Sequence, residues 1–337
     1  TDPLFDTPVP ERAVMAVMTS GTTGIPKILF RSFESWADFF AIQNAVFGVD
    51  ADSRLFVQGS LAFTGNLNLY MGQLAAGGTL IAEDVFLPGK WEQVMARERA
   101  NGIYLIPSKL LMLPRVFKGV NANIRTIISG SQSLGRKDAE VLKKIFPNTE
   151  ITLYYGASEL NYITYVKSAD MTEERNLIGK PFPGVRVFIQ DDEMYVDNAF
   201  HVENITVPYS LKDSGRMDLQ GNFYFLGRTD DIVGVRGRKV SMMKIENALE
   251  EVAGITEAAV VLLPKEKDAD MPAEIVSAFV TVEGTDVPEN LRQQLKEKLA
   301  DFEIPKRVIV LEAFPKNTSG KVDKARLKKM WIEQEPQ

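Results

Sequence analysis

Apolar runs and amphipathic helix patterns alternate through the first half of this 337-residue chain, and this order constrains its fold. Short apolar runs indicate strands at residues 13–18, 54–60, 79–83, 103–108, 125–130 and 151–156. Apolar residues three and four apart indicate helices at residues 32–48, 68–78 and 136–146. Strands separated by helices are typical of a parallel sheet with helices packed on its faces. We therefore predict an α/β fold with a mainly parallel sheet.

Residues 185–210 have a different pattern, in which β-branched and aromatic residues are interrupted by frequent turn residues. This favours short antiparallel strands added to the large domain. Beyond Arg228 the chain resembles a compact α+β unit. We predict a large α/β domain of residues 1–228 and a small, mobile α+β domain of residues 229–337, with the junction at 227–231.

Within the small domain, the apolar spacing predicts a helix that begins at Met242 and is ended by Gly254. A second helix has Asp286 at its start and leucines four residues apart at Leu291 and Leu295. The remaining apolar runs indicate strands at residues 257–263, 274–282 and 307–311.

The composition excludes several classes of function. The chain has no Cys, which removes disulfides, thiol catalysis and thiolate metal sites, and its single His, His201, lies in a segment typical of strand and turn. The net charge of −6 gives no electrostatic footprint for nucleic acid. No run of eighteen apolar residues indicates a membrane span. These features suit a cytoplasmic protein.

The stretch "VMTSGTTGIPKIL", residues 17–29, combines glycines, hydroxyl side chains and Lys27. Glycines let the backbone approach a ligand, and hydroxyl and N–H groups donate to anionic oxygens, so the stretch suits a phosphate site. The alternative is a polar surface loop. A P-loop is excluded, because Pro26 replaces its second glycine and Ile28 its magnesium-binding hydroxyl. The next segment also indicates a strand, whereas a P-loop opens into a helix.

This stretch resembles the phosphate loop of the adenylate-forming superfamily, which comprises acyl-CoA and aryl-CoA synthetases, luciferases and adenylation domains of peptide synthetases. Four further segments, at residues 154–159, 213–231, 233–246 and 314–324, match the family's motifs in the family's order. By this resemblance the phosphates of ATP are bound by Thr19, Ser20, Gly21, Thr22, Thr23, Gly24 and Lys27. The resemblance adds Ser131, Gln132 and Gly156 to the nucleotide site.

In "YYGASE" the resemblance implies that Tyr155 stacks on adenine, Ser158 meets the α-phosphate and Glu159 holds Mg²⁺. A flat ring suits a base, a hydroxyl an oxyanion and a carboxylate a hard cation. Asp213 and Arg228 correspond to the residues that bind the ribose. The usual Thr-Gly before Asp213 is replaced by Leu-Lys at 211–212.

The resemblance assigns the remaining motif residues to the mobile small domain. Asp230 takes the hinge position, and Gly237 and Lys239 belong to the loop that closes over the thiol in the second half-reaction. Gly234 stands where many members carry Lys. Lys321 corresponds to the lysine that bridges the acid's carboxylate and the α-phosphate; the alternative for this lysine is a solvated basic helix.

The implied reaction is carboxylate plus ATP giving acyl-AMP and pyrophosphate, followed by transfer to CoA or to the phosphopantetheine of a carrier protein. Members that activate amino acids carry an Asp near residues 63–66, and here no acid follows before Glu83. We therefore expect an apolar acyl or aryl acid, not an α-amino acid. The candidate pocket consists of Phe63, Thr64, Gly65, Asn66, Gly130 and Leu160, and core packing is the alternative role for several of these.

Only eighteen residues precede Thr19, whereas typical family members carry a substantial stretch before this loop. The chain is then a short member, a fragment, or one whose exposed sheet edge is covered by another subunit, such as a second copy in a homodimer. A non-catalytic relative that binds a nucleotide or acyl-adenylate as a partner subunit is the alternative function. The joint presence of Lys27, Glu159, Asp213, Arg228 and Lys321 favours the enzyme.

Overall fold

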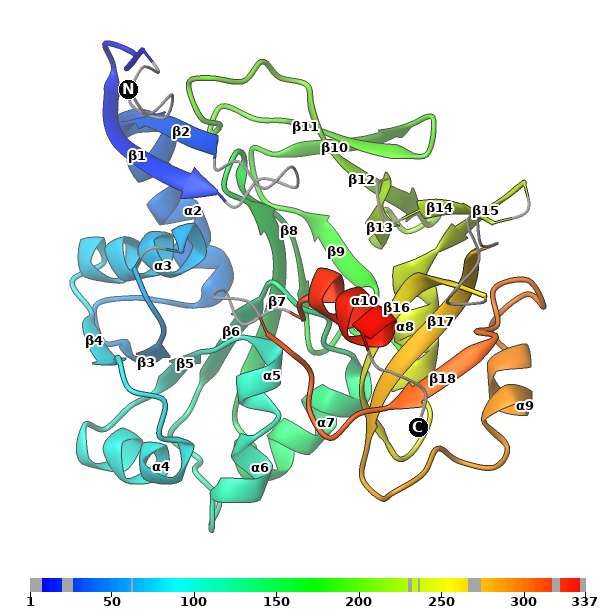
Figure 1. The fold of residues 1–337 in the computed structure, drawn as a ribbon. Coiled ribbons are helices and arrows are strands. Elements are labelled where there is room, and N and C mark those ends of the chain that lie inside the picture. Colours follow the sequence, from blue (N-terminus) through cyan, green and yellow to red (C-terminus); the bar gives the residue numbers. More distant parts are fainter. Residues whose placement is uncertain are drawn as a thin grey trace. The chain divides into compact units, whose positions relative to one another are not determined.

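The computed structural model describes residues 8–19, 27–61, 63–229, 232–235, 237–265, 274–316 and 322–333. Its contacts divide the chain into two units (Figure 1). The first comprises Thr1–Leu211 and Gly215–Phe225, and the second comprises Lys212–Ser214 and Leu226–Gln337. The mobility of the small domain and the functional boundary at 228/229 stay predictions.

Five parallel strands form the centre of the first unit, in the order β4-β3-β5-β6-β7. Their bounds are β3 Arg54–Gln58, β4 Thr79–Glu83, β5 Gly102–Tyr104, β6 Thr126–Gly130 and β7 Glu150–Ala157. β5 and β6 are buried at every residue, as expected for strands with both faces covered. The predicted parallel α/β sheet is therefore confirmed.

Helices connect these strands. They are α3 Thr64–Ala75, α4 Pro88–Arg97, α5 Pro107–Leu110, α6 Leu113–Val116 and α7 Arg136–Ile145. Because successive strand residues point to opposite faces, Phe56 packs in one hydrophobic cluster and its neighbours Leu55 and Val57 in another. Trp91 of α4 and Leu142 of α7 belong to the cluster of Phe56, so these helices cover one face of the sheet.

Antiparallel strands extend this sheet beyond β7, giving eleven strands in the order β10-β11-β12-β13-β9-β8-β7-β6-β5-β3-β4. Their bounds are β8 Asn161–Lys167, β9 Leu177–Pro181, β10 Arg186–Gln190, β11 Glu193–Asp197, β12 Tyr209–Met217 and β13 Phe223–Arg228. The short antiparallel strands predicted for the middle of the chain are confirmed.

The chain begins with an antiparallel pair, β1 Ala13–Thr19 and β2 Lys27–Ser32, followed by α1 Phe33–Ala37 and α2 Phe39–Phe47. The expectation of one continuous helix over residues 32–48 is wrong by one residue, because the helix is interrupted at Asp38. Ser32 caps α1 by accepting a hydrogen bond from the Ser35 N–H, and Gly48 ends α2 in a left-handed conformation with φ of 66°.

The second unit carries a three-stranded sheet in the order β16-β17-β18, with β17 antiparallel to β16 and parallel to β18. Its elements are β14 Ile232–Val235, β15 Arg238–Ser241, α8 Met242–Glu250, β16 Ile255–Pro264, β17 Glu274–Val282, α9 Leu291–Lys296, β18 Arg307–Val310 and α10 Lys324–Glu333. The two faces of this sheet pack in separate clusters, which contain Val260 and Val261 respectively.

Two predicted helix bounds in this unit are wrong. α8 ends at Glu250, four residues before Gly254, which instead forms the turn into β16 with φ of 93°. α9 begins at Leu291, not at Asp286, because Pro288 lies between them and disfavours helical backbone in the residue before it.

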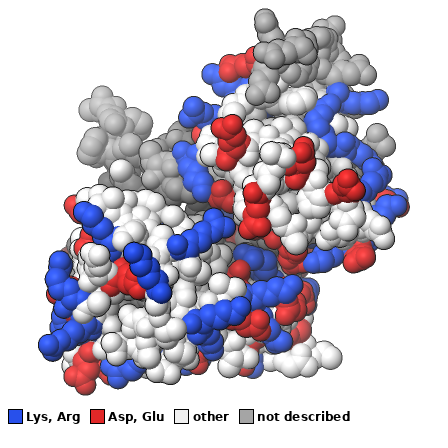
Figure 2. Space-filling model, turned by 90° about the horizontal axis from the view of Figure 1, so that it is seen from below, with Lys and Arg blue, Asp and Glu red and all other residues white. Residues whose placement is uncertain are grey.

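The surface shows no region of a single charge sign on the face drawn in Figure 2, where Lys and Arg are interspersed with Asp and Glu. On β1, Val14 and Met18 are 61% and 66% exposed. The predicted homodimer, which could cover these side chains, stays a prediction. Among the described residues, none of the helices is long and apolar enough to cross a lipid bilayer.

Gly179 and Gly221 provide a test of how tightly β9 packs inside the sheet. Both have φ of 78°, but a Cβ at Gly179 would lie 2.0 Å from the Tyr165 carbonyl oxygen, whereas a Cβ at Gly221 meets nothing within 4 Å. We expect Gly221→Ala to lower the free energy of unfolding by about 1 kcal/mol and Gly179→Ala by roughly 3 kcal/mol or more, measured by urea unfolding. Equal losses would contradict the packing of β9.

Candidate active site

The candidate site residues of the first unit follow the carboxyl ends of its parallel strands. Ser131 and Gln132 come directly after β6, Tyr155 lies near the end of β7, and Thr64 begins α3 after β3. Carboxyl ends of parallel strands meet at one edge of a sheet, where open α/β sheets bind their ligands. The fold therefore gathers residues that stand nearly a hundred positions apart in the sequence.

Thr64 and Ser158 join the two predicted parts of the site. Their hydroxyl oxygens lie 2.6 Å apart, a hydrogen-bond distance at which either hydroxyl can donate. Thr64 was predicted for the acid pocket and Ser158 for the α-phosphate. An acid next to Thr64 would therefore lie beside the α-phosphorus that it must attack.

Gly65 and Gly130 make room for a buried pair of tyrosines. A Cβ at Gly130 would lie 2.4 Å from the Tyr154 ring, and one at Gly65 would lie 2.9 Å from the Tyr154 hydroxyl. The hydroxyls of Tyr104 and Tyr154 are hydrogen-bonded at 2.7 Å, and burial raises the pKa of Tyr154 to about 12, so both are neutral. The structure gives both glycines a packing role, and any contact with the acid stays a prediction.

The other predicted pocket residues differ in exposure. Leu160 is fully buried in a hydrophobic cluster, whereas Phe63 is 45% exposed. Asn66 is buried and donates from Nδ2 to the Ser60 carbonyl oxygen at 2.8 Å, which fixes the loop between β3 and α3.

Arg31, which the sequence analysis missed, holds the turn that carries Ser158 and Glu159. Its side chain is completely buried. Nη2 donates to the Ser158 carbonyl oxygen at 2.9 Å, and Nη1 donates to the carbonyl oxygens of Phe200 at 2.8 Å and Ser35 at 3.2 Å. One guanidinium thus ties the end of β2 to two segments far along the chain.

The charge of Arg31 also affects this turn. Burial lowers the pKa of Arg31 to about 10, and the nearby Glu159 carboxylate opposes that shift. Arg31 therefore stays a cation at neutral pH, close to the carboxylate predicted to hold Mg²⁺. A lone Arg inside the apolar run "ILFRSF" was the available signal, because a charged residue in such a run is exposed or paired.

Strained backbone lies beside several site residues. Ser131, Asn161 and Lys212 have φ of 70°, 66° and 62°, a left-handed conformation that side chains rarely adopt. A Cβ at Gly156 would lie 2.6 Å from the Asn161 carbonyl oxygen, so only glycine allows this close approach of β7 and β8. Such strain gathers at functional sites, where the surrounding structure maintains it.

The aromatic and ribose candidates have defined neighbours. Tyr155 is half-buried, and its ring centroid lies 5.8 Å from that of Phe225. In the second unit, Arg228 Nε lies 3.5 Å from the Asp213 carboxylate; Asp213 is buried and the Arg228 side chain is half exposed. The fold therefore brings the two predicted ribose residues together.

The predicted loops are closed by residues that the structure describes. Thr19 pairs with Lys27 at the open end of the β1–β2 hairpin, and Lys27 is exposed. A bridge between Lys316 and Val322 encloses the position of Lys321. Gly237 turns β14 into β15 with φ of 78°. The described residues do not include Ser20, Gly21, Thr22, Thr23, Gly24, Asp230 and Lys321, nor the side chains of Thr19 and Lys239.

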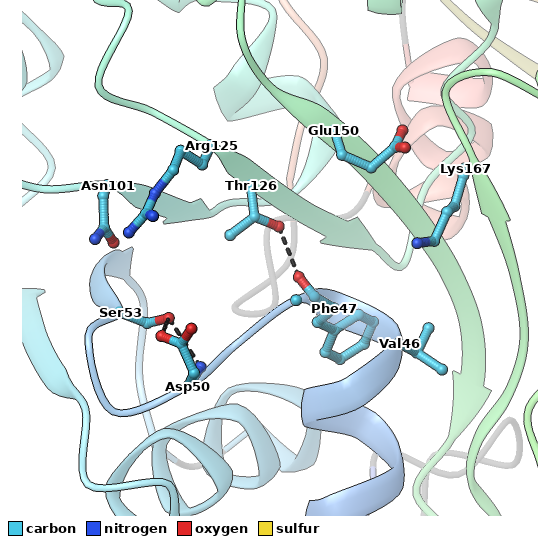
Figure 3. A pocket seen from close by; sticks show the side chains of 10 residues that line it. Val46, Phe47, Asp50, Ser53, Asn101, Arg125, Thr126, Glu150 and Lys167 are labelled. Carbon is cyan, nitrogen blue, oxygen red and sulfur yellow. Dashed lines mark hydrogen bonds between the residues drawn. The ribbon is translucent and has the colours of Figure 1, made fainter.

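A second hollow lies at the opposite edge of the sheet (Figure 3). Thr126 and Glu150, the first residues of β6 and β7, line it together with Asp50, Arg125 and Lys167. It is therefore at the amino ends of the parallel strands, where open α/β sheets do not bind their ligands. We exclude it as the candidate active site.

Metal binding in the first unit depends on Glu159. Across the described ranges, no three His, Cys, Asp or Glu side chains gather as a metal site. Mg²⁺ is commonly held by one or two carboxylates together with phosphate oxygens and water, so a single half-buried carboxylate on a rigid turn fits a magnesium–nucleotide complex.

The role of Arg31 generates a stability prediction with a matched control. Arg31→Met leaves three buried carbonyl groups without their donor, so the free energy of unfolding should fall by about 3 kcal/mol. Arg12 pairs with Glu34 at 3.3 Å on the exposed surface, so Arg12→Met should change it too little to resolve. Urea unfolding measures both, and similar effects of the two substitutions would contradict the assignment.

Comparisons with known proteins follow the same division of the chain. A family model described as AMP-binding enzyme matches residues 2–199, and one described as AMP-binding enzyme C-terminal domain matches residues 244–321. The uncharacterized acyl–CoA ligase YhfT of Bacillus subtilis is 27% identical over 348 residues, which cover 97% of this chain and 70% of the relative. The linear gramicidin synthase of Brevibacillus parabrevis has a polypeptide that is also 27% identical, and the match covers 92% of this chain and 7% of that polypeptide.

The fold agrees with solved structures. The O-succinylbenzoate coenzyme A synthetase of Bacillus subtilis, in complex with ATP and magnesium ion, has a TM-score of 0.80 at 20% identity, covering 93% of this chain and 69% of that one. The family models match more than half of the chain and agree with the motifs described above. The chain belongs to the family of AMP-binding enzymes, the adenylate-forming superfamily.

Proposed function

We propose that this chain activates a carboxylic acid with ATP, giving acyl-AMP and pyrophosphate, and passes the acyl group to a thiol. The observation that carries the proposal is the 2.6 Å contact between Thr64 and Ser158, on a turn fixed by buried Arg31. It joins the predicted acid site to the predicted α-phosphate site at the ligand-binding edge of the sheet. The names of its relatives, an acyl–CoA ligase and a linear gramicidin synthase, agree with this reaction.

The first step needs alignment and charge neutralisation more than acid–base catalysis. A carboxylate is already ionised at neutral pH, so one of its oxygens can attack the α-phosphorus directly while pyrophosphate leaves. This suits a chain with no Cys and one His. His201 is engaged elsewhere, because its Nδ1 lies 2.7 Å from the Val202 carbonyl oxygen.

Each candidate residue has a role that its chemistry allows. Ser158 donates to an oxygen of the α-phosphate, and Lys321 bridges that phosphate and the attacking carboxylate. Glu159 holds Mg²⁺, which when bound neutralises charge on the phosphate oxygens. The loop after Thr19 binds the leaving pyrophosphate, and Asp213 with Arg228 binds the ribose.

The second step places the acyl group on CoA or on a carrier-protein phosphopantetheine. The β14–β15 hairpin, which turns at Gly237, supplies the loop that closes over the thiol after rotation about Asp230. We retain both acceptors, since one named relative is an acyl–CoA ligase and another is a linear gramicidin synthase. We also retain a cytoplasmic location as a proposal, supported by the lack of Cys.

Substitution of Lys321 separates the two half-reactions. Lys321→Ala should lower acid-dependent ATP–pyrophosphate exchange at least 100-fold, because the carboxylate loses its electrostatic bridge. It should leave thiolation of supplied acyl-AMP within a few-fold of wild type. Lys328→Ala, at an exposed position of α10, is the matched control and should leave both rates unchanged.

Three outcomes would count against these assignments. Equal loss of both half-reactions in Lys321→Ala would contradict the role of Lys321. Exchange that survives the substitution would do the same. Absence of exchange across fatty, aryl and amino acids, with ATP still bound, would favour the non-catalytic relative.

A further inference from the structure

Lys109 places a positive charge at the carboxyl edge of the parallel sheet. It lies in α5, which begins three residues after β5 ends. The side chain is half-buried. Its Nζ donates to the side-chain oxygen Oε1 of Gln58, lies 3.4 Å from the Gln58 carbonyl oxygen, and sits 5.9 Å from the centroid of the Phe86 ring.

Lys109 is linked to both loops that the sequence assigns to the substrate site. Its neighbour Ser108 donates from the backbone N–H to Gln132 Oε1 at 2.9 Å, in the loop after β6. Gln58 ends β3 and leads into Gly59, where a Cβ would lie 2.5 Å from Nδ2 of the predicted pocket residue Asn66. The lysine thus lies between the loop after β3 and the loop after β6.

The charge of Lys109 is not balanced by the protein. No ion pair within 4.0 Å joins it to a carboxylate of the described residues, and Glu83, which pairs with Gln58 across β3 and β4, is not such a partner. By contrast, Lys244 in the small domain lies 2.6 Å from the Glu303 carboxylate. The atoms that contact Lys109 Nζ belong to an amide side chain and a backbone carbonyl, which are uncharged.

Desolvation explains why this arrangement favours an anionic ligand. Burial lowers the pKa of Lys109, because the cation loses part of its hydration without gaining a counter-charge. An ammonium has three N–H donors, and Gln58 accepts from at most two of them. A ligand anion would accept the remaining hydrogen bond and restore the charge balance.

We propose that Lys109 binds a second anionic group of the acid, at the end opposite the carboxylate that attacks ATP. This inference rests on the proposed function and narrows its substrate class. The substrate is then an acyl or aryl acid with a second carboxylate. Phe86 and Gln58 flank that group, one through its ring and the other through its amide.

The test compares matched acids that differ by one carboxylate: glutarate with pentanoate, adipate with hexanoate, and terephthalate with benzoate. Acid-dependent ATP–pyrophosphate exchange is measured for wild type, Lys109→Met, Lys109→Arg and the exposed control Lys90→Met. Binding of the same acids is measured by calorimetry, and thermal unfolding reports whether each variant folds. Wild type and Lys90→Met should favour at least one diacid over its partner at least tenfold in kcat/KM.

Lys109→Met should lower that preference at least tenfold, through a raised KM and dissociation constant for the diacid, and should leave the monoacid within a few-fold. Lys109→Arg should retain most of the preference because it keeps the charge. Exchange that favours monoacids in wild type, or a preference that survives in Lys109→Met, would overturn the inference and leave the proposed function standing. No exchange with any acid would remove the proposed function and the inference together.

Discussion

The buried guanidinium of Arg31 is the interaction on which the candidate site depends. It sits at the end of β2, and its hydrogen bonds to the Ser158 and Phe200 carbonyl oxygens span 127 and 169 residues of sequence. The strand that leaves the predicted phosphate loop is thereby fixed to the turn that carries Glu159. Because the cation is fully buried, its geometry is set by packing and does not relax into solvent.

The sheet provides the second constraint. Parallel strands from β3 to β7 bring their carboxyl ends to one edge, so the loops after each strand share one region although they are distant in sequence. Thr64, Ser158 and Lys109 come from three of these loops. The first two form the position where acid and α-phosphate meet, and the third supplies charge for the acid's other end. Attack and selectivity are thus separate properties of neighbouring loops.

Local patterns were sufficient for the architecture and insufficient for the contacts. Alternating strands and helices predicted the parallel sheet because hydrophobic period and turn residues are local properties. The bound of α9 was misplaced because Pro288 was not weighed against the leucine spacing. Motif spacing identified Ser158 and Glu159, but the partner of their turn, Arg31, is fixed only by tertiary packing. The roles of residues 20–24 and of Lys321 stay predictions, since they lie outside the described residues.

The most direct test of the account follows an oxygen atom through the reaction. The acid is supplied with ¹⁸O in the reacting carboxylate, together with ATP, Mg²⁺ and CoA, and the products are analysed by mass spectrometry. If the carboxylate attacks the α-phosphorus and the thiol then displaces AMP, each AMP carries one ¹⁸O and pyrophosphate carries none. Formation of ADP with ¹⁸O in inorganic phosphate, or AMP without label, would contradict acyl-adenylate formation by this chain.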